Sequence, residues 1–463
     1  MKKILVIILP FLLLFTFLSF SQSLKSGNES TSDDIVDKID KLITPLVSTN
    51  NFAGTVLIIK GGKTIFSKSY GKMDFENDID NTSDSKFLLA STSMMFTASA
   101  IMKLVDENKI SLDDKLSKFF PDYKNGDKIS IHYMLTERTG IPRIGDFTYN
   151  RITKHPQSLE KLISYFKDYD LLFEPGEEYN HGRNEYILLA SIIEKVSGKS
   201  FGVYLKEEIF DPLGMKNTGH FSYDTNESDI VKLSKGWTEV GFIGLKRAPV
   251  IHWSAKTGHA SIYSTAEDMG KFANAIANRE LLSSKSWDAM LTDYYGDSFG
   301  YGLFISGSHQ EGNIKYVMNG RSPGYTSHFA IYPEQKNMIV IMLGNIYNSL
   351  PYFVGPKLAS LVSGEPYEKL NLTTRRISKE YAQNVIGTYQ FGDFYRPNGS
   401  VKITLKEGIL RSDGAAMIPV EDEEGVIIKF INRRYWSTLK FVPDNEGNIV
   451  ALKYDNFLSK KKQ

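Results

Sequence analysis

Residues 88–105 read LLASTSMMFTASAIMKLV, and their spacing predicts a helix that begins near Ser91 and runs to Val105 with an apolar face. A serine at the start of a helix caps the first-turn N–H groups whatever the function. The same position exposes a hydroxyl that can act as a nucleophile. Three residues further along stands Met94, whose thioether moves no useful proton at neutral pH. The stretch therefore predicts a core helix and leaves two interpretations of its serine.

The segments around this helix predict a sheet assembled from both ends of one domain. Upstream, FAGTVLIIKGGKTIFSKSYG (52–71) indicates two strands joined at Gly61-Gly62. The pattern is mainly helical from about 91 to 235, with a helix from Tyr186 that stops at Gly198 and another over about 264–278. Strand patterns return at 301–305, 327–333 and 337–345. We therefore expect an α/β domain over residues 22–365.

Beyond residue 365 the character of the sequence changes. Short alternating runs, separated by glycines and a DNEGN turn, indicate a small antiparallel β domain over 376–463, either a sandwich or a barrel.

The N-terminal residues have the pattern of an export signal. Lys2 and Lys3 precede an apolar run from Ile4 to Leu18, and small residues follow at spacing suited to cleavage. We expect residues 1–21 to be removed, with no stable membrane span afterwards, and the protein to be exported to the periplasm or the cell exterior. The alternative is an uncleaved anchor, for which the run is short.

Composition excludes several classes of function. A formal net charge of +1 over 463 residues gives no electrostatic case for nucleic acid or an anionic membrane. The chain has no cysteine, so neither disulfides nor thiol catalysis are available. None of the eight histidines pair at metal-ligand spacing, so the sequence predicts no metal site.

An ordered series of segments between about 40 and 360 resembles the serine β-lactamase superfamily. The series includes MLTERTGIP, FEPGEEYNHGRNEYILLASIIEKVSGKSF, DPLGMKNTG, YSTAEDMGKF and GRSPGYTSHFAIYP. The resemblance is to the branch that holds class C β-lactamases, DD-peptidases, penicillin-binding proteins and related esterases. It implies an antiparallel sheet with a helical subdomain, and acyl transfer through an acyl-serine. The chemistry that the resemblance implies needs neither a metal nor an organic cofactor.

The resemblance also implies where the catalytic groups lie. The family's serine falls on Ser91, but the lysine three residues later is Met94. The family's third motif, Lys or His, then any residue, then Gly, falls on Met318 and Gly320, so its cation is again lost. Arg321 follows directly and restores a positive charge near the cleft.

The family's Tyr-x-Asn motif falls, without a gap, on His181 and Arg183. A shifted alignment with two compensating length changes would instead give the tyrosine role to Tyr179. Imidazole titrates near neutrality and pairs naturally with a serine, so His181 is a candidate base. Arg183 is a candidate partner for an anionic group, and we expect its charge to lower the pKa of His181.

Two further stretches imitate catalytic motifs. Lys256-Thr257-Gly258 spells the third motif but precedes YSTAEDMGKF, whereas the family's motif follows that segment, so we interpret it as a loop. Gly198-Lys199-Ser200-Phe201-Gly202 spells a nucleophile elbow, which needs an entering strand, and here a helix enters.

Two hypotheses about function remain. In the first, the protein is a catalytically impaired member of the superfamily, with classical β-lactamase and DD-peptidase activity lost or strongly reduced. It then acts by binding a peptide, a peptidoglycan-like molecule or a small acyl ligand. In the second, it is an active esterase or peptidase that uses Ser91 as nucleophile and His181 as base.

Overall fold

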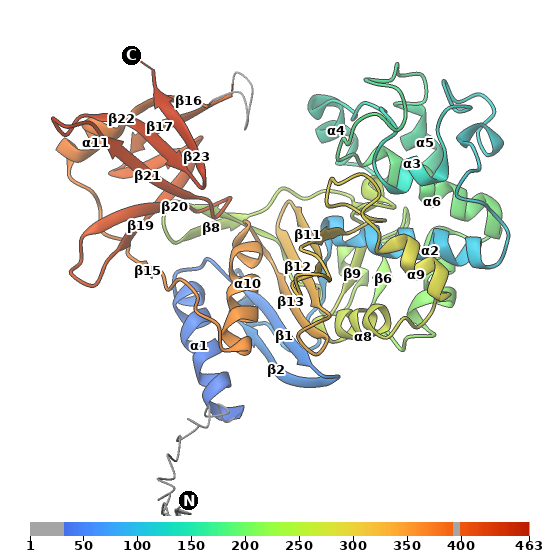
Figure 1. Ribbon diagram of the computed structural model, residues 1–463, viewed down its shortest axis with the longest axis horizontal. Helices are drawn as coiled ribbons and strands as arrows, with labels where there is room; N and C mark the ends of the chain where they lie inside the picture. Colours follow the sequence, from blue (N-terminus) through green and yellow to red (C-terminus); the bar gives the residue numbers. More distant parts are fainter. Residues whose placement is uncertain (1–31, 392–398, 463) are drawn as a thin grey trace, which may run out of the picture.

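The computed structural model describes residues 32–391 and 399–462. Figure 1 shows a sheet flanked by helices, a helical region beside it, and a separate group of strands near the C-terminal end. The expected export signal, residues 1–21, lies outside the described residues. None of the helices that are described is long and apolar enough to cross a membrane.

The central sheet has six antiparallel strands, and its spatial order is β10-β11-β12-β13-β1-β2. Its strands are β1 (Gly54–Lys60), β2 (Lys63–Tyr70), β10 (Phe304–Ser306), β11 (Lys315–Ser322), β12 (Tyr325–Tyr332) and β13 (Met338–Gly344). The N-terminal hairpin thus completes a sheet made largely from late residues, which confirms the sequence-based prediction. Strand β10 begins later than expected because Gly302, with φ of 77°, interrupts the extended backbone.

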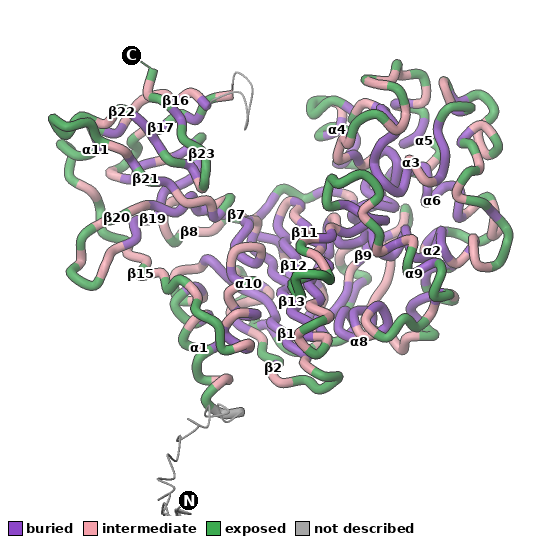
Figure 2. The backbone as a smooth tube through the Cα atoms, viewed as in Figure 1, coloured by how far each residue is buried: buried purple, intermediate pink, exposed green. Residues whose placement is uncertain are grey.

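Helices cover both faces of this sheet. On one side lie α1 (Ser32–Ser48) and α10 (Leu350–Ser363), and on the other α8 (Ala266–Ala277). Strand β1 alternates between the two cores, since Val56 and Ile58 pack with α1 and α10 while Leu57 and Ile59 join the opposite cluster. The sheet is therefore buried on both faces, as Figure 2 shows.

The helical region follows β2 in the chain and contains α2 and α3–α7. These helices are α2 (Met94–Asp106), α3 (Ile131–Leu135), α4 (Asp146–Ile152), α5 (Leu159–Ser164), α6 (Asn184–Ser197) and α7 (Phe201–Leu205). Helix α6 ends at Gly198, which has φ of 70°, so the GKSFG stretch is a helix stop as predicted. Short strands form two small three-stranded sheets, ordered β14-β7-β8 and β5-β9-β6. Their bounds are β5 (Phe87–Leu88), β6 (Gly219–His220), β7 (Trp237–Val240), β8 (Gly244–Arg247), β9 (Ile262–Ser264) and β14 (Ile346–Tyr347).

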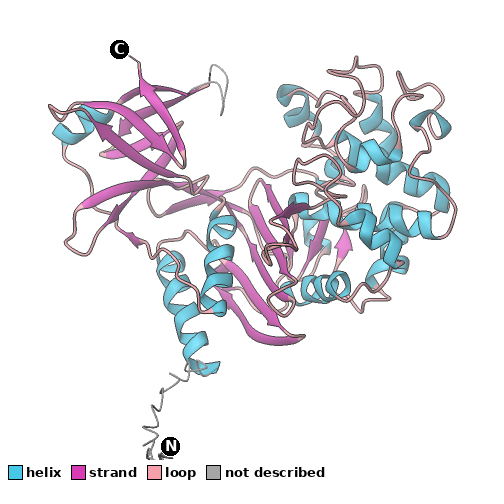
Figure 3. Cartoon of the chain, in the orientation of Figure 1, coloured by secondary structure: helices cyan, strands magenta, loops and turns pink. Residues whose placement is uncertain are grey.

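The C-terminal domain is an eight-stranded antiparallel barrel (Figure 3). Its strands are β16 (Gly387–Phe391), β17 (Ser400–Lys406), β18 (Ile409–Ser412), β19 (Ala415–Glu421), β20 (Ile427–Asn432), β21 (Thr438–Pro443), β22 (Ile449–Tyr454) and β23 (Phe457–Lys461). Pairing of β19 with β20 closes the ring. Closure leaves no open edge, so of the two predicted alternatives, sandwich and barrel, the structure is the barrel.

One arginine ties the barrel to the rest of the chain. Arg433, directly after β20, is fully buried. Its guanidinium donates to the Asn51 side chain at 2.8 Å and to the carbonyls of Asn50, Val240, Gly241 and Gly244 at 2.8–3.1 Å. Burial lowers the pKa of Arg433 to about 10. Trp436 packs beside it in the same core as α1 and α10. The barrel is thus fixed against the first domain.

Candidate active site

Ser91 lies in a short 3-10 turn (Ala90–Ser93) directly before α2. Ala90 has φ of 51° although it is not glycine, a conformation that alanine adopts at a cost and that occurs often at functional sites. The turn is held against β12, because Ser327 Oγ donates to the Leu89 carbonyl at 2.6 Å and lies 2.8 Å from Thr92 Oγ1. These contacts place the serine at the edge of the sheet.

Strand β11 passes so close to Ser91 that only glycine fits at position 320. A Cβ on Gly320 would stand 2.1 Å from the Leu89 carbonyl oxygen and 3.0 Å from the Ser91 nitrogen. The first N–H groups of a helix have no partner within it, so the Ser91 N–H is suited to stabilise an oxyanion. The close backbone approach expected at Gly320 is present.

Two adjoining cavities, of about 200 and 800 Å³, meet at Ser91. The smaller is lined by Ser91, Met94, Arg143, Tyr149, His181, Gly182, Arg183, Lys256, His259, Ala260, Arg321 and Ser322. The structure therefore brings together five side chains that the sequence analysis placed at the site: Ser91, Met94, His181, Arg183 and Arg321. Met318 is fully buried in the large core cluster and lines neither cavity.

A carboxylate that sequence analysis missed holds His181. The Oε2 atom of Glu137 lies 2.7 Å from His181 Nδ1, and the Glu137 side chain is fully buried. A carboxylate only accepts hydrogen bonds, so Nδ1 carries the proton and Nε2 is left as the nitrogen with a free lone pair. Glu137 also has φ of 55°, a second left-handed non-glycine residue at this site.

This arrangement raises the pKa of His181. Burial alone would lower it, but the charge of Glu137 and its hydrogen bond outweigh burial. Arg143, rather than Arg183, is the cation that opposes the shift. The expectation that Arg183 lowers this pKa is therefore wrong. The guanidinium of Arg183 instead lies over the Tyr149 ring at 3.8 Å, and it is 4.0 Å from the exposed Asp146.

A second buried carboxyl group lies beneath His181. Glu185 accepts from Thr139 Oγ1 at 2.7 Å through one oxygen, while its Oε2 has no partner. Burial first, and then the charge of Glu137, raise the pKa of Glu185 to about 7. Tyr179 borders the same cluster, with its hydroxyl 3.4 Å from His181 Nδ1, but it does not line the cavities at Ser91.

Lys256 also reaches the Ser91 cavity, although sequence analysis interpreted it as part of a loop. It ends a 3-10 turn (Trp253–Lys256), away from β11, so it is not the third motif. Its ammonium nevertheless donates to Ser322 Oγ, on β11, at 2.9 Å. Only the tertiary structure could reveal this, because 165 positions separate Lys256 from Ser91.

The barrel supplies one wall of the larger cavity. Tyr435 follows Arg433 and places its ring 4.7 Å from the Arg321 guanidinium. Arg321 also donates to Ser349 Oγ at 2.9 Å, so its position is fixed from two sides. The residues that line this cavity include Val401, Asp413, Tyr435, Trp436 and Asp455 from the C-terminal domain.

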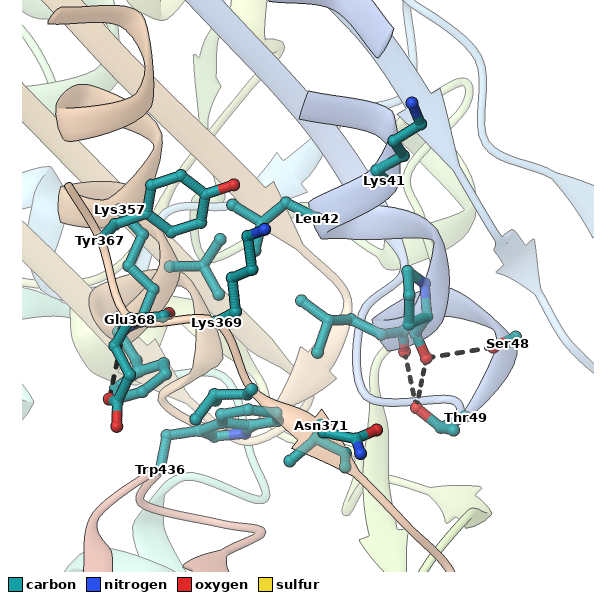
Figure 4. Close-up of a pocket in the computed structure, with 16 residues that line it drawn as sticks. Lys41, Leu42, Ser48, Thr49, Lys357, Tyr367, Glu368, Lys369, Asn371 and Trp436 are labelled. Carbon is teal, nitrogen blue, oxygen red and sulfur yellow. Dashed lines mark hydrogen bonds and ion pairs between the residues drawn. The ribbon is translucent and has the colours of Figure 1, made fainter. Parts of the chain in front are cut away.

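Another pocket, of about 480 Å³, lies between α1, α10 and the segment before the barrel (Figure 4). Several of its polar groups have structural partners: Ser48 and Thr49 both donate to the Pro45 carbonyl, and Lys357 pairs with Glu368. It contains neither Ser91 nor His181. Among the described residues no group of three or more His, Asp or Glu side chains is placed to hold a metal ion.

Comparison with known proteins identifies relatives of the first domain. The family model Beta-lactamase matches residues 39–358. Teichoic acid D-alanine hydrolase from Staphylococcus aureus is 26% identical over 320 residues, which cover 68% of this chain and 75% of that protein. The crystal structure of a penicillin-binding protein from Bacillus halodurans has 27% identity and a TM-score of 0.59, covering 70% of this chain and 98% of that one. An octameric penicillin-binding protein homologue from Pyrococcus abyssi has 24% identity, a TM-score of 0.65 and coverage of 92% and 99% respectively, and shows the fold alone.

Proposed function

Since the chain belongs to the Beta-lactamase family, we propose that it is an acyl hydrolase in which Ser91 is the nucleophile, His181 the general base and Glu137 the group that orients the base. The observation that carries the proposal is the 2.7 Å hydrogen bond between His181 Nδ1 and Glu137. It fixes the tautomer that leaves Nε2 ready to accept a proton, in a cavity that also holds Ser91.

In the proposed reaction, the Ser91 oxygen attacks the carbonyl carbon of an ester or amide, and His181 Nε2 takes the hydroxyl proton. The oxyanion is stabilised by the Ser91 N–H and by backbone N–H groups of β11. Collapse of the adduct breaks the bond to the leaving group, which receives the proton from His181. Water then attacks the acyl-serine with His181 again as base, and the acid product leaves.

Small acyl esters are the proposed substrates rather than β-lactams. The name of the Staphylococcus aureus relative, a teichoic acid D-alanine hydrolase, supports an ester or amide of a small acyl group. Met94 and Met318 stand where the family has its base and its cation, and a thioether neither takes up a proton at neutral pH nor carries a positive charge. The proposal places this reaction outside the cytoplasm, on the basis of the charged and apolar pattern of residues 1–21.

The second candidate function is ligand binding without turnover. It is favoured by the Ser91 hydroxyl, which makes no hydrogen bond to His181 or Lys256 in the described structure. Catalytic hydrogen bonds often form only once substrate is bound, so this observation carries less weight than the tautomer of His181.

Labelling and kinetics together test the proposal. The wild-type protein should form a fluorophosphonate adduct on Ser91 and hydrolyse 4-nitrophenyl acetate. Ser91→Ala, His181→Ala and the double variant should all fall to one floor, because parts of one proton-transfer unit are not additive. His155→Ala, which changes an exposed histidine, is the matched control and should keep full activity. No adduct, together with a wild-type rate already at that floor, would support the binding function instead.

A further inference from the structure

Lys256 is a buried cation without a carboxylate partner. Its side chain is 8% exposed, and none of the ion pairs among the described residues includes it. Besides the hydrogen bond to Ser322 Oγ, its ammonium lies 5.2 Å from the Tyr149 ring centroid and 5.7 Å from that of Trp253. These contacts offset only part of the cost of removing an ammonium ion from water. An unpaired buried charge of this kind calls for a partner.

A second polar group in the same cavity is also incompletely satisfied. His259 is 5% exposed and its Nε2 lies 3.2 Å from the Tyr149 hydroxyl, while its Nδ1, beside the Thr257 backbone, makes no hydrogen bond of good geometry. Burial, and then the charge of Lys256, hold the pKa of His259 well below its usual range. His259 is therefore neutral at neutral pH and offers a hydrogen bond rather than a charge.

The cavity as a whole has an excess of positive charge. Lys256, Arg183 and Arg321 all line it. Of the nearby acids, Glu137 is engaged by His181, and Asp146 is 92% exposed beside Arg183. An anion in the cavity would meet several cations and the buried imidazole of His259.

Position along β11 links Lys256 to the reaction centre. Ser322, its hydrogen-bond partner, lies two residues beyond Gly320, whose backbone runs beside Ser91. Met318, on the same strand, has no charge to offer. Lys256 thus brings a cation, from a different segment of the chain, to the strand from which a cation is missing.

We propose that Lys256 is a substrate-binding residue that pairs with an anionic group, a carboxylate or a phosphate, carried by the acyl substrate beside its scissile carbonyl. This inference rests on the proposed function, because it names the substrate class for the same site. It adds no covalent step: Lys256 holds the anion while Ser91 and His181 carry out the chemistry.

The first test compares two esters of equal length, 4-nitrophenyl hydrogen adipate and its neutral methyl ester. Lys256→Met should lower kcat/KM for the anionic ester by about ten- to hundredfold, mainly through KM, since one charge-assisted hydrogen bond is lost. The neutral ester should change by less than about threefold. Lys256→Arg should keep part of the preference, and Lys246→Met, an exposed lysine on β8, should change neither ester. Equal losses for both esters would overturn the proposal.

A binding measurement separates this inference from the proposed function. Calorimetry on the Ser91→Ala protein should show binding of monomethyl adipate or glycerol 3-phosphate. The double variant Ser91→Ala, Lys256→Met should bind neither probe. The two probes distinguish a carboxylate from a phosphate. Binding that depends on Lys256 in a protein without ester turnover would retain this inference and refute only the catalytic proposal. Binding that survives Lys256→Met, or no binding of either probe, would refute the inference.

Stability distinguishes a substrate-binding lysine from a structural one. Removal of an unpaired buried charge is neutral or stabilising, so Lys256→Met should melt at the same or a higher temperature than the wild type. A lower melting temperature with both esters equally impaired would show that Lys256 serves the fold.

Discussion

Replacement of Glu137 by glutamine tests the proposed mechanism at the contact on which it depends. The change keeps the size of the side chain and removes the charge that faces His181 Nδ1 at 2.7 Å. A hydrogen bond to a charged group contributes about 1.5–3 kcal/mol, which at 1.36 kcal/mol per decade corresponds to roughly a ten- to hundredfold loss of rate. The amide of glutamine can also donate to Nδ1 and select the wrong tautomer, which extends the loss toward about 10⁴-fold.

The pH profile gives this prediction a sign. Glu137 raises the pKa of His181, and His181 must be neutral to act as a base. In the wild type, kcat/KM for 4-nitrophenyl acetate should therefore rise with pH through a value above that of an ordinary histidine, about 6.5. In Glu137→Gln the charge that raises the pKa of His181 is gone. The increase of kcat/KM with pH should therefore move to lower pH, and the plateau value of kcat/KM should fall.

Two observations would refute this reasoning. One is a Glu137→Gln protein that keeps more than about a third of wild-type kcat/KM with an unmoved pH profile. The other is an equal loss in Glu178→Gln, the matched change of an exposed glutamate in the same region. An unchanged melting temperature of Glu137→Gln would exclude a folding defect as the cause of a loss.

Three further predictions concern stability and lost chemistry. Folding raises the pKa of Glu185 from 4.5 to about 7, so its proton is bound more tightly in the folded state. The free energy of unfolding should therefore fall by roughly 3 kcal/mol between pH 4.5 and pH 8, and urea denaturation of Glu185→Gln should not show this fall. Arg433→Ala leaves several buried acceptors of the first domain without a donor and should lower the free energy of unfolding by about 4 kcal/mol or more, measured in urea against the exposed control Lys440→Ala. Wild-type protein should neither hydrolyse nitrocefin nor be acylated by fluorescent penicillin, and cephalosporin turnover that depends on Ser91 would contradict this. Met94→Lys should restore neither activity and should lower the melting temperature, because the new ammonium would be buried in the cavity that Arg183 lines, with no anion to pair with it.

Sequence patterns were sufficient for the fold because they are local. The Gly61-Gly62 turn, the stop at Gly198 and the alternating apolar residues of β1 each follow from the conformational preference of a few neighbouring residues. The closure of the C-terminal strands into a barrel is different. It depends on the pairing of β19 with β20, a tertiary contact that composition cannot distinguish from a sandwich.

The site was only partly predictable for the same reason. Family order located Ser91, His181 and Arg183, but the groups that determine their chemistry come from other segments. Glu137 stands in MLTERTGIP, a stretch we had quoted only for its resemblance, and its charge offered the one signal that could have identified it. Lys256 gave a misleading signal. With its neighbours it spells the family's third motif, but it lies in a 3-10 turn rather than on β11.

The ring of Tyr435 against Arg321 means that two separate stretches of the gene shape one cleft. The reacting groups are encoded before residue 365, whereas part of the wall that a substrate must pass is encoded after it. Recombination that exchanged the downstream stretch could therefore alter which molecules are admitted and leave the bond-breaking apparatus intact. Selection on substrate specificity and selection on catalytic chemistry can thus act independently in related proteins. Tyr435 is a position at which to compare the two.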